Sequence, residues 1–331
     1  MNRRDLILGA AALAAVAACA PEAESQAPAP FPMRRGVNLG NALEAPNEGD
    51  WGYRIEAAHL EAIAAAGFDG VRLPVRWDAH VDGVGRIAAA HMARVAEVVD
   101  WALERGLRVQ LDVHHYARLI EDPRGERARF LLIWRQIAER FADAPEALMF
   151  EPINEPHGSH WDGAALTDLQ GLALEMIRTS NPTRLVVFGP GNWQNIDALR
   201  NWRPPAGENV AVSVHYYEPH AFTHERAEWL GDEAPVFGRA WGSESDRSAA
   251  RAHIAQAAAW GRAHGYAMQL GEFGVNRAVS LAQRAVWTRA VREACEAEGM
   301  AWCAWDFAGA FPVWDRERGV WIEDVRRALL D

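Results

Sequence analysis

The chain has 331 residues, of which 50% are hydrophobic and 24% are charged, an ordinary globular composition with enough apolar material for a large core. The formal net charge of -11 makes nucleic acids and anionic membrane surfaces unfavourable partners. Tryptophan is the outlier, with 15 residues against 5 tyrosines, and this surplus suits a site that stacks flat apolar faces.

The start of the chain predicts an export signal that is not part of the fold. Residues 1–18 combine an apolar centre with a basic start that resembles a twin-arginine signal. The following "VAAC" resembles a bacterial lipobox, so we expect lipid attachment at Cys19, as the only membrane contact, and an outer-membrane or periplasmic location. A plain signal peptide with secretion is the alternative. Residues 19–33 are rich in Pro and Ala and predict a tether, which leaves residues 34–331 for the folded domain.

Two cysteines follow Cys19, at positions 295 and 303. They could pair in an oxidising compartment. Cys295 falls in a predicted helix and Cys303 in the next predicted strand, both mostly apolar, which favours two buried free thiols. No Cys/His spacing is typical of a zinc site, so we expect no metal.

From residue 35 onward, short apolar segments alternate with longer segments of helical periodicity. The predicted strands are residues 35–41, 70–77, 108–115, 147–154, 184–189, 210–217, 267–273 and 301–307. The predicted helical segments are residues 56–67, 89–106, 127–143, 167–180, 195–200, 249–265, 281–299 and 322–331.

This alternation of strands and helices predicts a closed parallel (β/α)8 barrel, the TIM barrel, in a single domain. Most of the strands are near-continuous apolar runs, as expected for parallel strands that are buried on both faces. An open doubly wound sheet is the main alternative. No GxGxxG or GxxxxGK[ST] motif opens a helix, so nothing indicates a phosphate-binding version of that sheet.

Polar and aromatic residues gather at the carboxyl ends of the predicted strands, where a barrel of this type carries its active site. They are Asn38 and Asn41, Arg72 and Trp77, His114 and His115, Asn154 and Glu155, His215 and Tyr217, Glu272, and Trp305 and Asp306. The fifth strand is followed by an uncharged set, Asn192 and Trp193. Each residue alone has a structural explanation, but together they predict one common cleft.

Two carboxylates stand out in this set, Glu155 after the fourth strand and Glu272 after the seventh. Burial of an unpaired carboxylate is costly, so each needs a partner or a function. Paired glutamates across a cleft are what glycoside hydrolysis requires, because one protonates the leaving oxygen while the other attacks the anomeric carbon or activates water. Arg72 and Tyr217 can hydrogen-bond a carboxylate and keep it ionised, as a nucleophile must be.

Three further residues suit the same chemistry. His215 can hold the acid/base in position, and Asn154 can donate a hydrogen bond to a sugar 2-hydroxyl. Trp305 can form an apolar floor under a sugar ring.

Seven segments in chain order resemble glycoside hydrolase family 5, the cellulase family, and cover nearly all of residues 34–331. They are "RGVNLGNALEAPNEGDWG", "GFDGVRLPVRW", "LDVHHY", "FEPINEPHG", "VSVHYYEPHAFTH", "LGEFG" and "WCAWDFAGAFPVWD". The resemblance implies a retaining glycosidase whose acid/base is Glu155, in the Asn-Glu-Pro motif, and whose nucleophile is Glu272. It places around the attacked sugar Arg72, His114, Asn154, His215, Tyr217 and Trp305, and it matches substrate contacts of the endoglucanase subgroup at Asn38, His115, His224 and Trp229.

The residues just before Glu155 have a different expected role. Glu151 lies deeper in the barrel, where we expect a structural ion pair or hydrogen bond with Arg72 or Arg108 rather than catalysis. Pro152 replaces the apolar residue that is more usual in the family. Because proline removes a ladder donor, we expect a bulge or local irregularity there.

The expected reaction is double displacement on a β-1,4-linked glucan, with the two carboxyl groups about 5 to 5.5 Å apart. We expect a monomer that needs no metal or organic cofactor and acts on a β-linked polysaccharide or oligosaccharide. A β-mannanase or a mixed glucan/mannan hydrolase of the same family is the nearest alternative. A non-catalytic surface glycan-binding protein would suit the lipid anchor and the tryptophans, but it has no need of both glutamates.

Two other enzyme classes are weaker alternatives. A metal-dependent hydrolase would use His114, His115 and His215 with a carboxylate. A Ser/His/Asp hydrolase lacks support, because no GxSxG motif follows a predicted strand.

Overall fold

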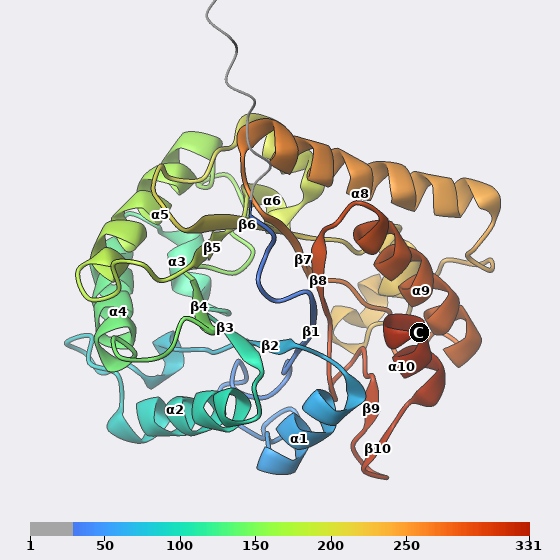
Figure 1. The fold of residues 1–331 in the computed structure, drawn as a ribbon, viewed down its shortest axis with the longest axis horizontal. Coiled ribbons are helices and arrows are strands. Elements are labelled where there is room, and N and C mark those ends of the chain that lie inside the picture. The colour runs from blue at the N-terminus through green and yellow to red at the C-terminus, as the bar shows by residue number, and fades with distance from the viewer. Residues whose placement is uncertain (1–28) are drawn as a thin grey trace, which may run out of the picture.

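Eight short apolar segments form a closed barrel of parallel strands in the computed structural model, which describes residues 29–331 (Figure 1). The strands are β1 Arg35–Asn38, β2 Gly70–Leu73, β3 Arg108–Asp112, β4 Leu148–Glu151, β5 Val186–Phe188, β6 Val210–His215, β7 Met268–Glu272 and β8 Ala301–Ala304. Each strand pairs with its neighbour in the sequence, and β8 pairs with β1, so the barrel has no free edge. The predicted (β/α)8 barrel is therefore confirmed.

Helices surround the barrel and connect the strands (Figure 1). They are α1 Ala57–Ala66, α2 Ala89–Glu104, α3 Ala117–Glu121, α4 Arg127–Arg140, α5 Gly163–Arg178, α6 Gly191–Gln194, α7 His220–Thr223, α8 Glu244–His264, α9 Leu281–Ala297 and α10 Glu323–Leu330. Short 3₁₀ segments are η1 Asp78–His80, η2 Ile196–Asn201 and η3 Glu228–Glu233, and a small hairpin pairs β9 Trp314–Asp315 with β10 Val320–Trp321. The short elements α3, α6 and α7 were not predicted, and each lies in a connection that follows a strand.

Each strand ends one to four residues earlier than the sequence predicted. The predicted strand 70–77 ends at Leu73, and the predicted strand 147–154 ends at Glu151. Pro152 lies in a bend directly after β4. The expected irregularity at Pro152 is therefore present, and the ladder does not need the N–H that proline lacks.

The apolar side chains form two buried groups. The larger one fills the space between the barrel and its helices. The smaller one fills the amino-terminal end of the barrel interior and consists of Phe31, Met33, Met149, Val187, Ala211, Ala301 and Cys303. Phe31 and Met33 fall within the predicted tether, so the tether prediction extended too far, because these two large apolar side chains cover the open end of the barrel.

The rest of the barrel interior is polar. Arg72, Gln110, Glu151, Ser213 and Gln269 are fully buried there. This layer lies between the apolar plug and the carboxyl ends of the strands, so it supports the site from below.

The two cysteines of the described chain, Cys295 and Cys303, are both buried and free. Of the two possibilities that the sequence left open, the structure therefore has the free thiols. Burial raises the pKa of both thiols, which keeps them protonated and unreactive.

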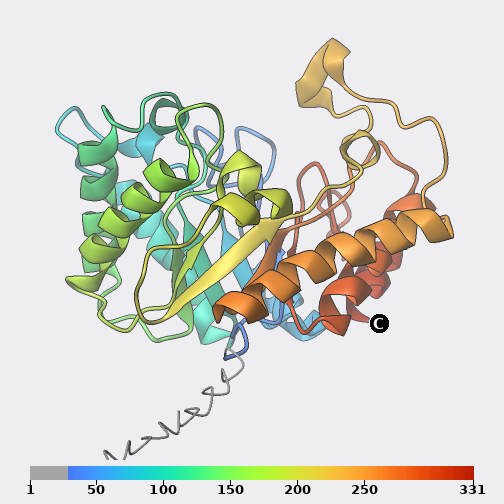
Figure 2. The same ribbon diagram turned by 90° about the horizontal axis from the view of Figure 1, so that it is seen from above.

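Figure 2 shows the barrel from the side, with the connections that follow the strands gathered at one end. The segment between β6 and α8, residues 216–243, projects farthest and is drawn in yellow to tan at the upper right. Within residues 29–331, no helix is both long and apolar enough to cross a membrane. The predicted signal and Cys19 lie outside the described residues.

Candidate active site

An open cleft of about 1010 Å³ lies at the carboxyl ends of the strands. Most of the predicted site residues line it: His114, His115, Glu155, His215, Tyr217, His224, Trp229, Glu272 and Trp305. Three exposed tryptophans, Trp51, Trp193 and Trp229, also line the cleft and present flat apolar faces to solvent. The cleft is as large as the largest ordinary small-molecule sites, so it has room for more than one sugar ring.

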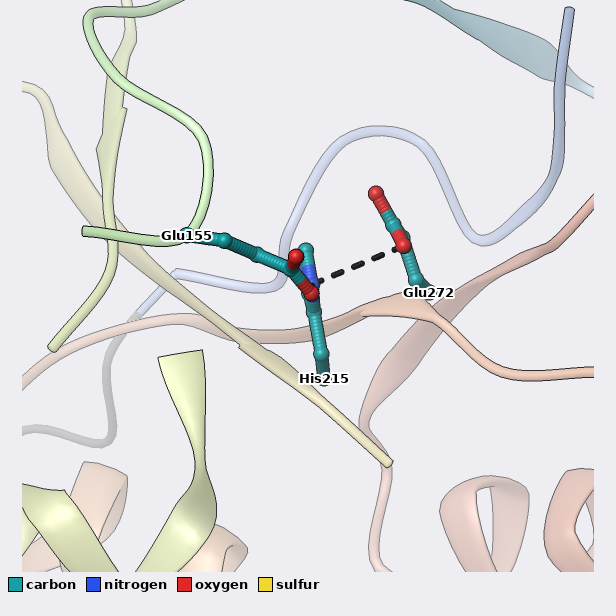
Figure 3. Close-up of side chains that lie close together, drawn as sticks. All are labelled: Glu155, His215 and Glu272. Atoms are coloured by element: carbon teal, nitrogen blue, oxygen red, sulfur yellow. Dashed lines mark hydrogen bonds and ion pairs between the residues drawn. The ribbon is translucent and has the colours of Figure 1, made fainter. Parts of the chain in front are cut away.

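Two glutamates face each other in the cleft, as Figure 3 shows. Glu155 lies in the connection after β4, and Glu272 is the last residue of β7. A carboxylate oxygen of Glu155 and one of Glu272 lie within 4.8 Å of each other. This spacing fits the separation of about 5 to 5.5 Å in retaining glycosidases and not the roughly 6.5 to 9.5 Å of inverting ones.

His215, the last residue of β6, lies between the two glutamates (Figure 3). Its Nδ1 is 2.8 Å from Oε1 of Glu155 and 3.6 Å from Oε2 of Glu272. Burial lowers the pKa of His215, so the imidazole is neutral near neutral pH and adds no charge between the carboxylates.

The two glutamates receive different hydrogen bonds. Glu272 accepts from Nη1 of Arg72 at 2.6 Å and from the hydroxyl of Tyr217 at 2.9 Å. The carboxyl group of Glu155 has His215 as its side-chain partner. Hydrogen bonds from a cation and a hydroxyl stabilise an ionised carboxylate, so Glu272 has the environment of a nucleophile.

Burial raises the pKa of both carboxyl groups to about 7. The charge of Glu155 adds to the effect of burial at Glu272 and also raises the pKa of that carboxyl. Two interacting carboxyl groups at this separation hold one proton between them over a range of pH near neutrality. We place this proton on Glu155, because Arg72 and Tyr217 stabilise the negative charge on Glu272.

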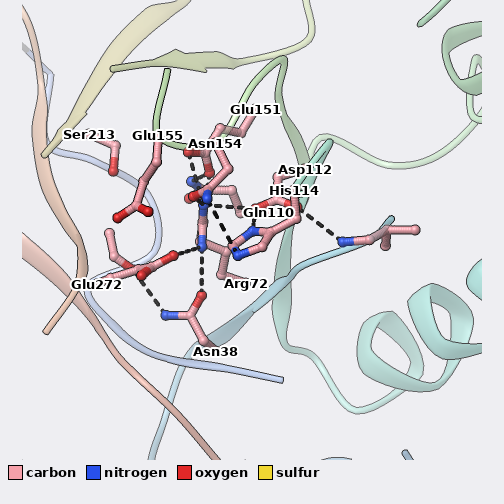
Figure 4. Close-up of polar contacts among 12 residues, drawn as sticks. Asn38, Arg72, Gln110, Asp112, His114, Glu151, Asn154, Glu155, Ser213 and Glu272 are labelled. Carbon is pink, nitrogen blue, oxygen red and sulfur yellow. Dashed lines mark hydrogen bonds and ion pairs between the residues drawn. The ribbon is translucent and has the colours of Figure 1, made fainter. Parts of the chain in front are cut away.

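Arg72 is the centre of a buried network beneath the cleft, drawn in Figure 4. Its guanidinium lies 2.6 Å from Glu151, 2.7 Å from Asp112 and 2.6 Å from Glu272. The predicted structural role of Glu151 is confirmed, with Arg72 as its partner.

Three predicted substrate contacts, Asn38, Arg72 and Asn154, are buried below the lining of the cleft. Asn38 is fully buried and donates from Nδ2 to the carbonyls of Gly271 at 2.9 Å and Ala304 at 3.2 Å. Its Oδ1 accepts from Arg72 at 3.0 Å, as does Oδ1 of Asn154 at 2.6 Å. The prediction that Asn38 contacts substrate is therefore corrected: it joins β1 to β7 and β8 and orients Arg72.

Asp112 is a site residue that the sequence analysis did not single out. It is fully buried between Arg72 and His114, and its Oδ2 lies 2.9 Å from Nδ1 of His114. The ring of His114 in turn stacks on Trp305, with centroids 5.5 Å apart and planes 5° from parallel. The sequence did contain a pattern that places Asp112 beside His114. The two residues are two positions apart in "LDVHHY", and residues two apart on a strand lie on the same face.

Other residues also differ from their expected places. Trp77 is not in the cleft but fully buried, with its indole N–H donating to the carbonyl of Asp112 at 2.9 Å. Trp51 was not proposed as a site residue, although it lines the cleft and meets the ring of His115 edge-on at 5.8 Å. Glu44 lines the cleft as well, and burial raises the pKa of its carboxyl to about 8.

The structure does not assemble the metal site that the histidines suggested. In residues 29–331, the one group of three converging ligand atoms belongs to Glu155, His215 and Glu272. Nδ1 of His114 is instead engaged by Asp112. The three histidines of the metal-hydrolase alternative therefore do not form a ligand set.

A parallel barrel with two glutamates, one half-buried and one buried, that face each other at the carboxyl ends of β4 and β7 is the architecture of a retaining glycoside hydrolase. Residues 33–310 match the family model described as Cellulase (glycosyl hydrolase family 5). The chain belongs to this family, and the resemblance seen in the sequence is confirmed.

Several endoglucanases are similar to this chain. Endoglucanase H of Acetivibrio thermocellus is 35% identical over 312 residues, which cover 92% of this chain and 33% of that protein. The solved structures of Thermotoga maritima Cel5A in complex with cellobiose and with mannotriose are each 38% identical, with a TM-score of 0.87, and the match covers 90% of this chain and 97% of theirs. The chain spans about a third of the length of the first curated relatives that it matches.

Proposed function

We propose that the protein is a retaining endo-β-1,4-glucanase in which Glu155 is the acid/base and Glu272 the nucleophile. The observation that carries the proposal is the pair of carboxylates within 4.8 Å of each other, of which the buried one, Glu272, accepts hydrogen bonds from Arg72 and Tyr217. The names of the similar endoglucanases support the same activity.

In the first step, Glu272 attacks the anomeric carbon while Glu155 gives its proton to the departing glycosidic oxygen. Arg72 and Tyr217 hold the attacking carboxylate ionised and oriented. Oε2 of Glu272, which accepts from Tyr217, also lies 3.6 Å from Nδ1 of His215. The products of this step are a covalent glycosyl-enzyme and a free chain end.

In the second step, Glu155 is ionised and acts as the base. It takes a proton from water, which attacks the anomeric carbon and displaces Glu272. The raised pKa of Glu155 suits both steps, because the group must lose and regain a proton near neutral pH. Nδ2 of Asn154 lies 3.4 Å from Nε2 of His114, and we assign it to the 2-hydroxyl of the sugar.

The shape of the cleft supports action on a polymer. It is open, and Trp51, Trp193 and Trp229 line it with half-exposed rings. Apolar ring faces suit the flat faces of β-linked sugars, so we assign these tryptophans, with His115, His224 and Trp305, to sugar binding along a chain.

The test is release of reducing sugar from carboxymethylcellulose, barley β-glucan and glucomannan, with the fall in viscosity followed in parallel. The purified protein is compared with its Glu272→Ala and Glu155→Ala forms. Wild-type activity on a β-1,4-linked glucan, with a rapid fall in viscosity and loss of activity in both variants, supports the proposal.

Each other outcome points to a different function. Faster release from glucomannan than from β-glucan would identify a mannan-directed enzyme, which is of interest because a similar structure is a complex with mannotriose. Binding of the polymers without release of sugar would identify a glycan-binding protein and contradict the proposal.

We further propose that the protein is exported and works as a lipid-anchored monomer. The supporting observations are the Arg3-Arg4 pair, the apolar run and the "VAAC" that ends at Cys19. Metabolic labelling with a radioactive fatty acid tests the anchor, and a Cys19→Ser variant should abolish the label.

A further inference from the structure

A left-handed turn follows β5 beside the acid/base. Asn192, Trp193 and Gln194 have consecutive φ values of 55°, 58° and 53°. Residues other than glycine rarely adopt this left-handed backbone conformation, and three such residues in a row are unfavourable unless tertiary contacts hold them. The contacts of this turn therefore indicate its purpose.

The side chain of Gln194 reaches from this turn to the backbone of Glu155. It is fully buried, and its Oε1 accepts a hydrogen bond from the N–H of Glu155 at 2.8 Å. Its Nε2 lies 3.3 Å from Oε1 of Glu151 and 3.4 Å from the carbonyl of Ser213. The amide thus joins the connection after β4 to β6, which carries His215.

The same turn also holds the other side of the Glu155 peptide. The carbonyl of Glu155 lies 2.7 Å from Nδ1 of His157, and the ring of His157 stacks on Trp193 with centroids 4.5 Å apart. The N–H of Trp193 donates to the carbonyl of Pro156 at 3.3 Å. Residues 193 and 194 therefore contact three successive residues that begin with the acid/base.

Glu155 needs such support because its own backbone is left-handed, with φ of 47°. A glutamate in this region is held by its surroundings rather than by its own preference. The direction of the Glu155 side chain depends on this backbone conformation. The hydrogen bond from the Glu155 N–H to Gln194 therefore helps to fix the position of the carboxyl group.

The chain also makes room for the Gln194 side chain. A Cβ atom at Gly189 would lie 2.3 Å from Nε2 and 2.4 Å from Cγ of Gln194. These atoms are the body of a buried side chain, so a larger residue at position 189 would displace it. Glycine at this position is a second, independent feature that serves the placement of Gln194.

We propose that Gln194 is a positioning residue for general acid catalysis, which it supports by fixing the backbone of Glu155. This inference rests on the proposed function, since it assigns a partner to the proposed acid/base. Without the acceptor, the Glu155 N–H is left unpaired, and the peptide relaxes away from its left-handed conformation. The carboxyl group then no longer meets the leaving oxygen in the required geometry.

A substrate that needs no proton separates this role from a general structural one. Dinitrophenolate leaves without protonation, whereas the oxygen of a glucan chain requires the acid. We would measure kcat/KM for cellotetraose and for 2,4-dinitrophenyl β-cellobioside with the wild type and with Gln194→Met, which keeps the length and removes the acceptor. The same two rates for Glu155→Gln define the full loss of the acid.

We expect Gln194→Met to lower kcat/KM for cellotetraose by about 10- to 100-fold, a partial loss of the roughly 100- to 10,000-fold that general acid catalysis contributes. The value for the dinitrophenyl glycoside should fall by less than about threefold. Gln136→Met is the matched control. Gln136 is a half-buried glutamine whose Oε1 also accepts a backbone N–H, that of Ile87 at 3.0 Å, and its hydrogen-bond partners do not include Glu155 or Gly189. We expect it to leave the ratio of the two rates unchanged.

Equal losses on both substrates, or no loss on cellotetraose, would overturn the inference. If Gln194→Met does not fold, Gly189→Ala takes its place, because it displaces the same side chain. The same ratio of kcat/KM for cellotetraose and for the dinitrophenyl glycoside is then measured. Failure of the wild type to cleave cellotetraose would instead reject the proposed function, so the two failures are distinguishable.

Discussion

The guanidinium of Arg72 lies 2.6 Å from Oε1 of Glu272 and 2.6 Å from Oε2 of Glu151. One buried cation therefore supports the proposed nucleophile from below and pairs with a second carboxylate deeper in the barrel. Asp112, at 2.7 Å, is the third carboxylate on the same cation. Stability and catalysis thus depend on one side chain.

Replacement of Arg72 by methionine should reduce both stability and activity. It leaves buried carboxylates without their shared cation, and breaking a buried ion pair in this way costs about 3 to 5 kcal/mol of unfolding free energy. Urea denaturation measures this loss, and kcat should fall on glucan and aryl glycoside alike. Arg251→Met is the control, because Arg251 pairs with Glu244 at the surface and should change stability by less than about 1 kcal/mol. An Arg72→Met protein as stable as wild type would contradict the network.

Replacement of Tyr217 by phenylalanine should shift the pH dependence of activity. The hydroxyl of Tyr217 donates to Glu272 and lowers the pKa of that carboxyl, which burial raises to about 7. Without this donor, the pKa of Glu272 rises further, so the nucleophile stays protonated to a higher pH. The acid limb of the kcat/KM profile between pH 4 and 9 should therefore move toward higher pH, by about 1 unit.

The neighbouring Tyr216 offers a matched control for Tyr217→Phe. Tyr216 is buried and does not line the cleft, and its ring packs against Trp287 with centroids 6.0 Å apart. Tyr216→Phe should leave the acid limb in place. A shift of equal size in both variants, or a shift of the acid limb to lower pH in Tyr217→Phe, would contradict the assignment of Glu272 as the ionised group.

The barrel and the catalytic pair could be predicted from sequence because both follow from local patterns. Buried parallel strands are continuous apolar runs, and their carboxyl ends meet at one edge whatever the details of packing. Glu155 and Glu272 follow such runs directly, so their meeting depended only on the correct order of strands. The strand ends were less accurate, because residues 74–77 still look like a strand although they lie beyond the end of β2.

The supporting residues could not be predicted in the same way. The role of Gln194 depends on a left-handed turn in "GNWQ" that the sequence only weakly indicates. Asn192 is of a type that favours the left-handed region, but Trp193 and Gln194 are not, and the glycine does not occupy a left-handed position. Asn38 was assigned to substrate because its position in the sequence does not show its depth. Met33 was assigned to the tether because only the closed barrel creates the opening that it covers.

Substitution of Gly271 by alanine should disturb the catalytic histidine. A Cβ at this position, one residue before Glu272, would lie 2.2 Å from Oγ of Ser213 and 3.1 Å from Nε2 of His215. The shorter contact displaces Ser213, and the contact with His215, which lies between both glutamates, requires that ring to move by a few tenths of an ångström. A shift of about 1 Å in a catalytic group can cost about 100-fold in rate, so the smaller movement of His215 should cost less than that. We expect kcat to fall by at least about tenfold.

The control for this substitution is Gly83→Ala. A Cβ at Gly83 would have no heavy atom within 4 Å, so kcat should not change. A Gly271→Ala protein with wild-type kcat would show that His215 does not need its present position. Its crystal structure would then show whether Ser213 alone had moved.

Substitution of Glu44 by glutamine should change how stability depends on pH. Burial raises the pKa of this carboxyl to about 8, against the backbone N–H groups of Asn41 and Ala42, which lower it. Between about pH 4.5 and pH 8 the folded protein holds a proton that the unfolded chain has lost. The wild type therefore loses stability as pH rises through this window, by up to about 1.4 kcal/mol per pH unit from this group.

Glu44→Gln has no such proton, so its stability relative to wild type should rise from pH 5 to pH 8. Urea denaturation at pH 5, 6, 7 and 8 measures this difference. Glu48→Gln is the contrasting variant. Burial raises the pKa of Glu48, but the hydrogen bond and charge of Arg94 outweigh it and lower this pKa. The stability that Glu48 contributes is therefore present above the pKa of the unfolded chain and is lost as the pH falls. The difference in unfolding free energy between Glu48→Gln and the wild type should therefore be constant from pH 6 to pH 8. A constant difference for Glu44→Gln as well would mean that Glu44 is ionised in the folded protein despite its burial.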